Sequence, residues 1–168
     1  MLLEPDRFRR VGTGSAGMVS AITVRAAVSA DEPRWRELWA GYNAFYEADI
    51  PEAITQATWR KILNPAVPVF GRVADIEGRL VGFSNSVLHE STWESGPICY
   101  LEDLFVASTA RGAGVGRMLL QDLVVLARQN GWPKLYWHTR ANNVTARRLY
   151  DTFTRADDFV RYVVRLEE

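Results

Sequence analysis

The sequence has little of the chemistry that disulfide-bonded and metal-binding proteins use. Its 168 residues include one cysteine, Cys99, and two histidines, His89 and His138. A single cysteine cannot form an internal disulfide or a cysteine-rich metal site, and two histidines far apart in the chain do not make a metal site by themselves. We therefore expect no bound metal and a reducing, cytoplasmic compartment.

An excess of charge of one sign and a long hydrophobic run are also missing. The 20 Lys and Arg residues equal the 20 Asp and Glu residues in number, which argues against a basic surface for nucleic acid. No apolar stretch reaches the roughly 18 residues that a membrane-spanning helix needs. These absences predict a protein with no nucleic-acid partner and no membrane span.

The length of the chain and its 48% hydrophobic content suit one packed domain. Residues 1–20 are rich in glycine and in small or polar residues, and we expect a disordered or extended tail there. The domain is expected to cover residues 21–168.

Hydrophobic periodicity changes repeatedly between the values for strands and helices, which predicts an α/β or α+β fold. The expected strands cover residues 21–25, 67–76, 80–88, 98–106, 135–139 and 159–166. The first expected helix begins near residue 29 or 31 and extends to 45. Further helices are expected over 54–63, about 115–129 and 142–153. A turn at Glu77-Gly78 joins two of the strands, and Asn130-Gly131 ends the third helix.

A glycine-rich segment joins the strand at 98–106 to the following helix. The backbone N–H groups at the start of a helix are unpaired and lie at its positive end, so a loop with few side chains can wrap a phosphate there. An ordinary tight turn between a strand and a helix would also use glycines. The segment consists of Arg111, Gly112, Ala113, Gly114, Val115, Gly116 and Arg117.

Two nucleotide-binding motifs do not fit this segment. The phosphate loop of nucleoside triphosphatases needs Lys and then Ser or Thr after its last glycine, but Arg117-Met118 follows here. A dinucleotide-binding loop needs the pattern G-x-G-x-x-G, but Arg117 stands where its last glycine belongs. What remains is the pattern R-x-x-G-x-G.

This pattern resembles the acyl-coenzyme A signature of the GNAT N-acetyltransferase superfamily, and the resemblance extends over residues 21–166. The run Tyr100-Leu-Glu-Asp-Leu-Phe-Val106 before the loop and the set Asn143, Ala146 and Tyr150 after it occur in the family's order. The run Tyr100–Val106 and the segment Tyr136-Trp-His-Thr139 are most similar to the diamine acetyltransferases and to the yeast-type histone and D-amino-acid acetyltransferases. The resemblance implies a mixed sheet of about six to seven strands flanked by about four helices.

The resemblance implies that acetyl-coenzyme A is the acyl donor. The strand ending at Val106 would separate from its neighbour at a bulge, and backbone groups of Leu104 and Val106 would pair with the pantetheine arm. Phe105 belongs to the same stretch, and the segment 111–117 would hold the phosphates. In the helix expected over 142–153, Asn143 would bond a pantetheine amide and the small Ala146 would allow close approach.

Direct attack by an amine needs a proton acceptor, and the leaving thiolate benefits from a proton donor. Glu102 and Tyr150 match those two roles, although Glu102 could be a plain surface carboxylate and Tyr150 a core aromatic. Because Glu102 lies in an apolar strand, we expect burial to raise its proton affinity. Asp103, on the opposite face of the strand, is the fallback.

Aromatic side chains with nearby carboxylates suit a cationic acceptor. The candidates for contact with the acceptor are Tyr42, Tyr46, Glu47 and Trp93. The acceptor is expected to be a small amine, polyamine, amino acid or protein lysine, and the family habit suggests a homodimer. The alternative is a catalytically silent module that binds acyl-coenzyme A as a sensor.

Overall fold

The computed structural model describes residues 8–9 and 21–166 of the chain. Nearly all of the expected tail, residues 1–20, lies outside this part. Phe8–Arg9 form a two-residue strand, β1, that pairs with β2 (Ile22–Ala26). The described residues fall into two compact units, one of residues 8–9 and 21–138 and one of residues 139–166.

The first unit is built on one mixed sheet. Its six strands lie in the order β1-β2-β3-β4-β5-β6, at the lower end of the expected number. All neighbours are antiparallel except β5 and β6, which run parallel. The remaining strands are β3 (Val69–Ile76), β4 (Arg79–His89), β5 (Ile98–Val106) and β6 (Leu135–Trp137).

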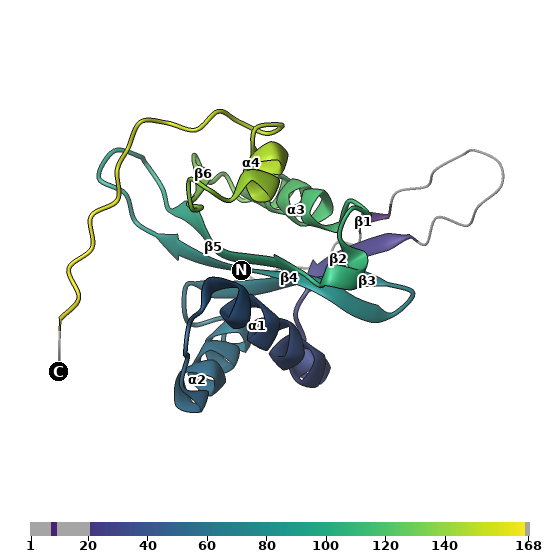
Figure 1. Ribbon diagram of the computed structural model, residues 1–168. Helices are drawn as coiled ribbons and strands as arrows, with labels where there is room; N and C mark the ends of the chain where they lie inside the picture. The colour runs from purple at the N-terminus through teal and green to yellow at the C-terminus, as the bar shows by residue number, and fades with distance from the viewer. Residues whose placement is uncertain (1–7, 10–20, 167–168) are drawn as a thin grey trace, which may run out of the picture. The chain divides into compact units, whose positions relative to one another are not determined.

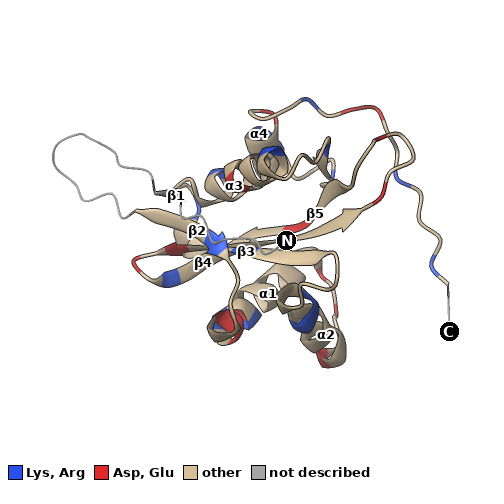
Figure 2. Ribbon diagram, turned by 180° about the vertical axis from the view of Figure 1, so that it is seen from behind, with Lys and Arg blue, Asp and Glu red and all other residues tan. Residues whose placement is uncertain are grey.

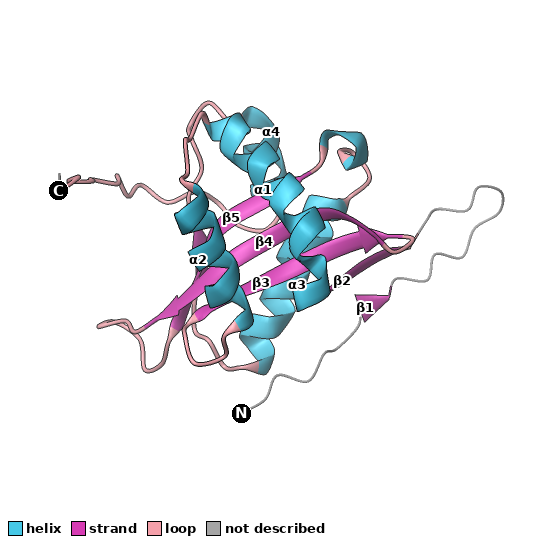
Figure 3. Cartoon of the chain, turned by 90° about the horizontal axis from the view of Figure 1, so that it is seen from below, coloured by secondary structure: helices cyan, strands magenta, loops and turns pink. Residues whose placement is uncertain are grey.

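Three helices cover the two faces of this sheet. Figure 1 and Figure 3 show α1 (Glu32–Tyr46) and α2 (Glu52–Leu63) on one face and α3 (Val115–Gln129) on the other. Short 3-10 turns precede α1 at Ser29–Asp31 and follow β5 at Ser108–Ala110. The mixed α/β fold expected from periodicity is confirmed.

Each face of the sheet has its own apolar core. Trp35, Trp39 and Phe83 are buried between the sheet and the two helices α1 and α2. On the other face, Val115 and Leu119 of α3 pack on Val24. Trp35, Leu38 and Trp39, which lie at helical spacing in α1, are therefore core residues.

Local sequence explains the turns of this unit. Glu77 and Gly78 have positive φ values of 54° and 80°. Positive φ at both central residues is typical of the tight two-residue turn that joins β3 and β4. Gly131, with φ of 67°, follows the end of α3 as expected.

Basic and acidic segments both occur on α1 and α2 (Figure 2), where Arg36 bonds Glu32 and Glu52.

The second unit contains α4 (Val144–Tyr150), which is shorter than the helix expected over 142–153. The strand expected over 159–166 is wrong, because these residues are in no strand of the described chain. Phe159, Tyr162 and Leu166 are 78%, 90% and 89% exposed. An apolar alternating pattern becomes a strand only where another strand pairs with it, and local sequence does not supply that partner.

Candidate functional site

The end of β5 has one edge that no strand of the described residues covers. β6 pairs only with Cys99, Tyr100 and Leu101 of β5, so the pairing stops before Leu104. The Ala107 N–H donates to the Val81 carbonyl oxygen of the opposite neighbour at 2.8 Å. Since alternate residues of an antiparallel strand bond to the same side, Leu104 and Val106 turn their backbone groups to the open edge.

A bulge lies just before this edge. In the register between β4 and β5, Asn85 faces Asp103 and Ser86 faces Leu101. Glu102 is therefore the extra residue on β5, without a partner across the ladder. Bulges change the direction of side chains and end regular pairing, which agrees with the bulge expected at this strand.

The glycine-rich loop leads from β5 into α3. Gly114 is the N-cap residue of α3, and it makes no side-chain cap hydrogen bond because glycine has no side chain. Gly112 and Gly114 have φ of 81° and 90°, a region that favours glycine, and a Cβ at either position would meet nothing within 4 Å. The glycines are thus required by the backbone conformation, which leaves the start of the helix uncovered.

The side chains of the glycine-rich loop are mostly exposed. Arg111, Ala113 and Arg117 are exposed, Gly116 is half-buried and Val115 is fully buried in the core. The Arg111 Nε donates to the Val106 carbonyl oxygen at 3.3 Å, and its guanidinium lies 5.9 Å from the centre of the Phe105 ring. One arginine therefore connects the loop with the open edge of β5.

The two adjacent carboxylates of β5 differ in burial, and the expectation for Glu102 is wrong on this point. The Glu102 side chain is exposed, because the bulge removes it from the regular alternation. Asp103 is 8% exposed instead. Burial raises the pKa of the Asp103 carboxyl to about 6, although hydrogen bonds from Asn85 and Tyr42 act in the opposite direction.

Asp103 belongs to a polar cluster that the sequence analysis did not assemble. The Asn85 Nδ2 donates to Asp103 Oδ2 at 3.0 Å, and the Tyr42 hydroxyl from α1 also hydrogen-bonds to this carboxylate. Burial, followed by the nearby Asp103 charge, raises the pKa of Tyr42. The signal that could have found the cluster is Ser84-Asn85-Ser86, three polar residues in an otherwise apolar strand that are all buried.

The four acceptor candidates are only partly brought together. Tyr46 packs on Tyr42 with ring centres 4.9 Å apart, and Tyr42 lies edge-on to Phe105 at 6.3 Å. Glu47 ends α1 in a left-handed conformation and is exposed. Among the described residues, the aromatic cluster of Tyr42 does not include Trp93, which is 80% exposed in the loop between β4 and β5.

In the second unit, Asn143 is the N-cap residue of α4. Its Oδ1 accepts a hydrogen bond from the Ala146 N–H at 3.3 Å, and its Nδ2 donates to Thr139 Oγ1 at 3.2 Å. The Asn143 oxygen thus caps the helix, and its amide nitrogen bonds a residue of the segment before the helix. Ala146 and Tyr150 are four residues apart in α4 and lie on one face of it.

Other chemically active groups of the first unit do not form a second centre. Burial raises the pKa of the Cys99 thiol to about 11, which makes it a poor nucleophile. The part of the chain that the structure describes holds no group of three or more metal-binding side chains. Within the same ranges, no helix combines the length and apolar character that crossing a membrane requires.

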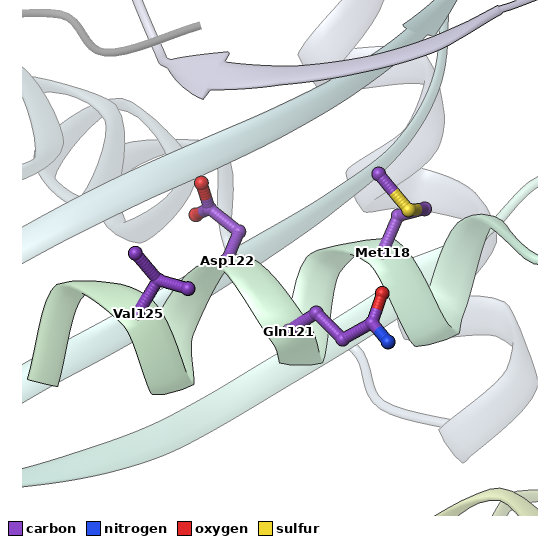
Figure 4. A pocket seen from close by; sticks show the side chains of 4 residues that line it. All are labelled: Met118, Gln121, Asp122 and Val125. Atoms are coloured by element: carbon purple, nitrogen blue, oxygen red, sulfur yellow. The ribbon is translucent and has the colours of Figure 1, made fainter. Parts of the chain in front are cut away.

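A small hollow on α3 is lined by Met118, Gln121, Asp122 and Val125 (Figure 4). Asp122 points from α3 toward the sheet. There it accepts two hydrogen bonds from Arg72 of β3, at 2.7 and 2.8 Å. The charge beside the hollow is therefore already paired inside the protein.

Comparison with known proteins agrees with this geometry. The sequence profile of the acetyltransferase (GNAT) family matches residues 32–153. A D-amino-acid N-acetyltransferase of Saccharomyces cerevisiae is 33% identical over 143 residues, which are 84% of this chain and 89% of the relative. An aminoglycoside N(6')-acetyltransferase type 1 of Stenotrophomonas maltophilia is 32% identical over 133 residues, covering 77% of this chain and 82% of the relative.

Solved structures show the same fold at low sequence identity. An aminoglycoside acetyltransferase from an uncultured soil metagenomic sample, in complex with trehalose, has a TM-score of 0.73 and 20% identity. The match covers 87% of this chain and 97% of that structure. A ribosomal-protein-alanine N-acetyltransferase of Brucella melitensis has a TM-score of 0.72 and 20% identity, with 86% and 99% of the two chains covered.

Proposed function

The chain belongs to the GNAT acetyltransferase family and is an N-acetyltransferase, and we propose that it transfers acetyl from acetyl-coenzyme A to a small primary amine. The open edge of β5 beside an uncapped helix start is the observation that carries this proposal. The relatives named for D-amino acids and aminoglycosides suggest which small amines to test. The proposed cytoplasmic location and homodimeric state follow from the sequence analysis alone.

The residues of the first unit fit an extended thioester that ends in phosphates. The backbone groups of Leu104 and Val106 face an open edge and can pair with the amides of a pantetheine arm. The N–H groups that begin α3, next to Gly112 and Gly114, can bind phosphate oxygens. Acetyl-coenzyme A would supply the activated acetyl group at this edge.

The remaining chemistry consists of proton transfers and charge stabilisation. We assign the uptake of the ammonium proton to Glu102, which is exposed at the bulge, and the return of a proton to the leaving sulfur to Tyr150. A backbone N–H at Leu104 would stabilise the negative charge that develops on the carbonyl oxygen, an effect of about 3 kcal/mol in other acyl transfers. The roles of Asn143, Ala146 and Tyr150 rest on the family pattern.

The experiment that tests this function is a calorimetric titration with acetyl-coenzyme A, followed by a thiol-release assay on amino acids of both hands, aminoglycosides, polyamines and a lysine peptide. Binding with release for one class would support the proposal and identify the acceptor class. Binding without release for any amine would favour the silent sensor. The absence of binding would contradict the assignment of the loop.

A matched pair of glycine variants separates the loop from general backbone strain. We expect Gly114→Ala to weaken acetyl-coenzyme A binding about tenfold or more, because φ of 90° is unfavourable for alanine and the helix start would move. Gly78→Ala has a similar φ of 80° and equally open space, but it lies in the turn between β3 and β4. The affinity of Gly78→Ala for acetyl-coenzyme A should stay within about twofold of wild type if the loop is the binding site.

A further inference from the structure

Three aspartates are buried among the described residues of the first unit, and they differ in their hydrogen-bond donors. Asp31 and Asp122 each accept two hydrogen bonds from an arginine, Arg25 at 2.6 and 2.8 Å and Arg72 at 2.7 and 2.8 Å. Asp103 accepts hydrogen bonds only from neutral groups, those of Asn85 and Tyr42. Over residues 8–9 and 21–166, no lysine or arginine pairs with Asp103.

A second acceptor atom in the same cluster also lacks a partner. Asn85 is 3% exposed, and its Oδ1 has no hydrogen bond in the described part of the chain. This oxygen lies over Gly71 of β3, where a Cβ would come within 3.6 Å of it. Buried acceptors normally have donors, and a buried carboxylate normally has a cation.

These two acceptors therefore suit a compact cation that can donate several hydrogen bonds. A primary ammonium has three N–H donors and one positive charge, and it fits both a carboxylate and an amide oxygen. A metal ion suits the cluster less well, because hard cations need several oxygen ligands and usually more than one carboxylate.

The cluster also lies where an acceptor would be needed. Asp103 directly precedes Leu104, the first residue whose backbone groups face the open edge of β5. Tyr42 places the cluster on the face of the sheet that α1 covers. We propose that Asp103 and Asn85 bind the ammonium group of the acceptor amine before its proton passes to Glu102. This inference rests on the proposed function and restricts the acceptor to amines that arrive as cations.

The binding site can be tested without knowing the acceptor, with methylammonium chloride as the probe and tetramethylammonium chloride as the matched salt. Unfolding midpoints of the full chain are measured in each salt, with coenzyme A present. Methylammonium should raise the midpoint of wild type above its value in tetramethylammonium, because only the first ion has N–H donors. Asp103→Asn should abolish this difference, whereas Asp75→Asn, at a half-buried carboxylate of β3, should keep it.

Equal shifts in wild type and Asp103→Asn, or no shift in wild type, would overturn the proposal. If circular dichroism shows that Asp103→Asn does not fold, Asn85→Ser removes the other acceptor and should reduce the methylammonium shift. An unchanged shift in that variant would equally count against the site.

A kinetic measurement then separates this inference from the proposed function. For the acceptor found by thiol release, Asp103→Asn should raise KM about 10- to 100-fold, the effect of losing a hydrogen bond to a charged group. The affinity for acetyl-coenzyme A should stay within about twofold, since the Leu104 edge and the loop are unchanged. If wild type transfers acetyl and Asp103→Asn has the same kinetics as wild type, the ammonium site alone is refuted. A wild type that shows the methylammonium shift but transfers no acetyl group refutes only the transfer activity.

Discussion

Two buried carboxylates on opposite sides of the sheet have different partners. Asp122 pairs with Arg72, whereas Asp103 lies with Asn85 and Tyr42. The first carboxylate has a bidentate arginine that is 8% exposed, and the pair links β3 to α3. The second has two neutral donors and no cation among the described residues. Both regions belong to one compact unit, so the difference does not come from the depth of burial.

The difference separates a structural charge from a charge that is available for binding. A paired buried charge has its partner in the folded chain, and its removal leaves the other member uncompensated. A buried carboxylate without a cation destabilises the free protein and becomes favourable only when a ligand brings the positive charge. Groups of this kind gather at functional sites, where stability is lower than packing alone would allow.

The largest expected effect comes from breaking the complete pair. Arg72→Met should reduce the free energy of unfolding by about 3 to 5 kcal/mol, because Asp122 would stay buried without a cation. Urea denaturation at neutral pH measures this loss. The double variant Arg72→Met, Asp122→Leu should recover most of it, since an apolar pair replaces a buried ion pair at little net loss. A single variant as stable as wild type would show that the pair is not structural.

At Asp103, the ionised carboxylate is expected to lower the free energy of unfolding. Its pKa is raised from 3.8 to about 6, so the folded protein favours the neutral acid. That stabilisation is fully present below the unfolded pKa and is lost as the pH rises through about 6. Relative to Asp103→Asn, wild type should therefore lose about 2 to 3 kcal/mol of stability between pH 4 and pH 7.

Thermal or urea unfolding of both proteins at several pH values gives this difference directly. The other titratable groups that face the cluster are Tyr42 from α1, which is also near Tyr46 and Tyr100, and Glu102 from β5. Their contributions are common to both proteins and cancel in the comparison. Parallel pH curves for the two proteins would show that Asp103 does not carry the buried charge.

A smaller effect is expected from Tyr42→Phe, which removes one of the two neutral donors to Asp103. The Tyr42 hydroxyl bond lowers the pKa of Asp103, so its loss should raise that pKa. The acid limb of kcat/KM for a cationic acceptor should move to higher pH, with roughly a two- to fivefold loss near pH 6. Rates of wild type and variant above pH 8 should agree, and a uniform loss at all pH values would instead indicate damage to packing.

The smallest effect is expected at the third buried aspartate. Burial raises the pKa of Asp31, but the hydrogen bonds of Arg25 and Val28 outweigh it, and the net pKa is lowered. The Arg25 side chain is 29% exposed, so water screens part of the interaction. Arg25→Gln should reduce the free energy of unfolding by about 1 kcal/mol at pH 7 in the same urea assay. A loss as large as that of Arg72→Met would show that partial exposure does not weaken such pairs here.

The parts of the site that could be predicted from sequence are those made by a continuous segment. The strand at Ile98–Val106, the glycine-rich loop after it and the start of α3 all follow from one continuous stretch of the sequence. The cluster of Asp103, Asn85 and Tyr42 could not be found in this way. It joins three elements, and the bulge at Glu102 decides which of the two carboxylates is buried.

The strand expected over residues 159–166 was wrong for the same reason. Its alternation is a local property, whereas strand formation requires a partner with free backbone groups. Asn143 was assigned a role toward the pantetheine arm, but its amide caps α4, which the family pattern does not reveal. Whether it can do both is decided by the coenzyme A titration on Asn143→Asp, which keeps the cap and loses the amide donor.

The sequence by itself determined the α/β class, the order of most elements and the loop that marks the family, because periodicity and turn residues act over short distances. The tertiary structure alone decided where β5 is left open, which carboxylate is buried and which buried carboxylates have a cation. These properties depend on the register between strands and on the helix that covers each face. Both are set by the packing of segments that lie far apart in the chain, such as Tyr42 and Asp103.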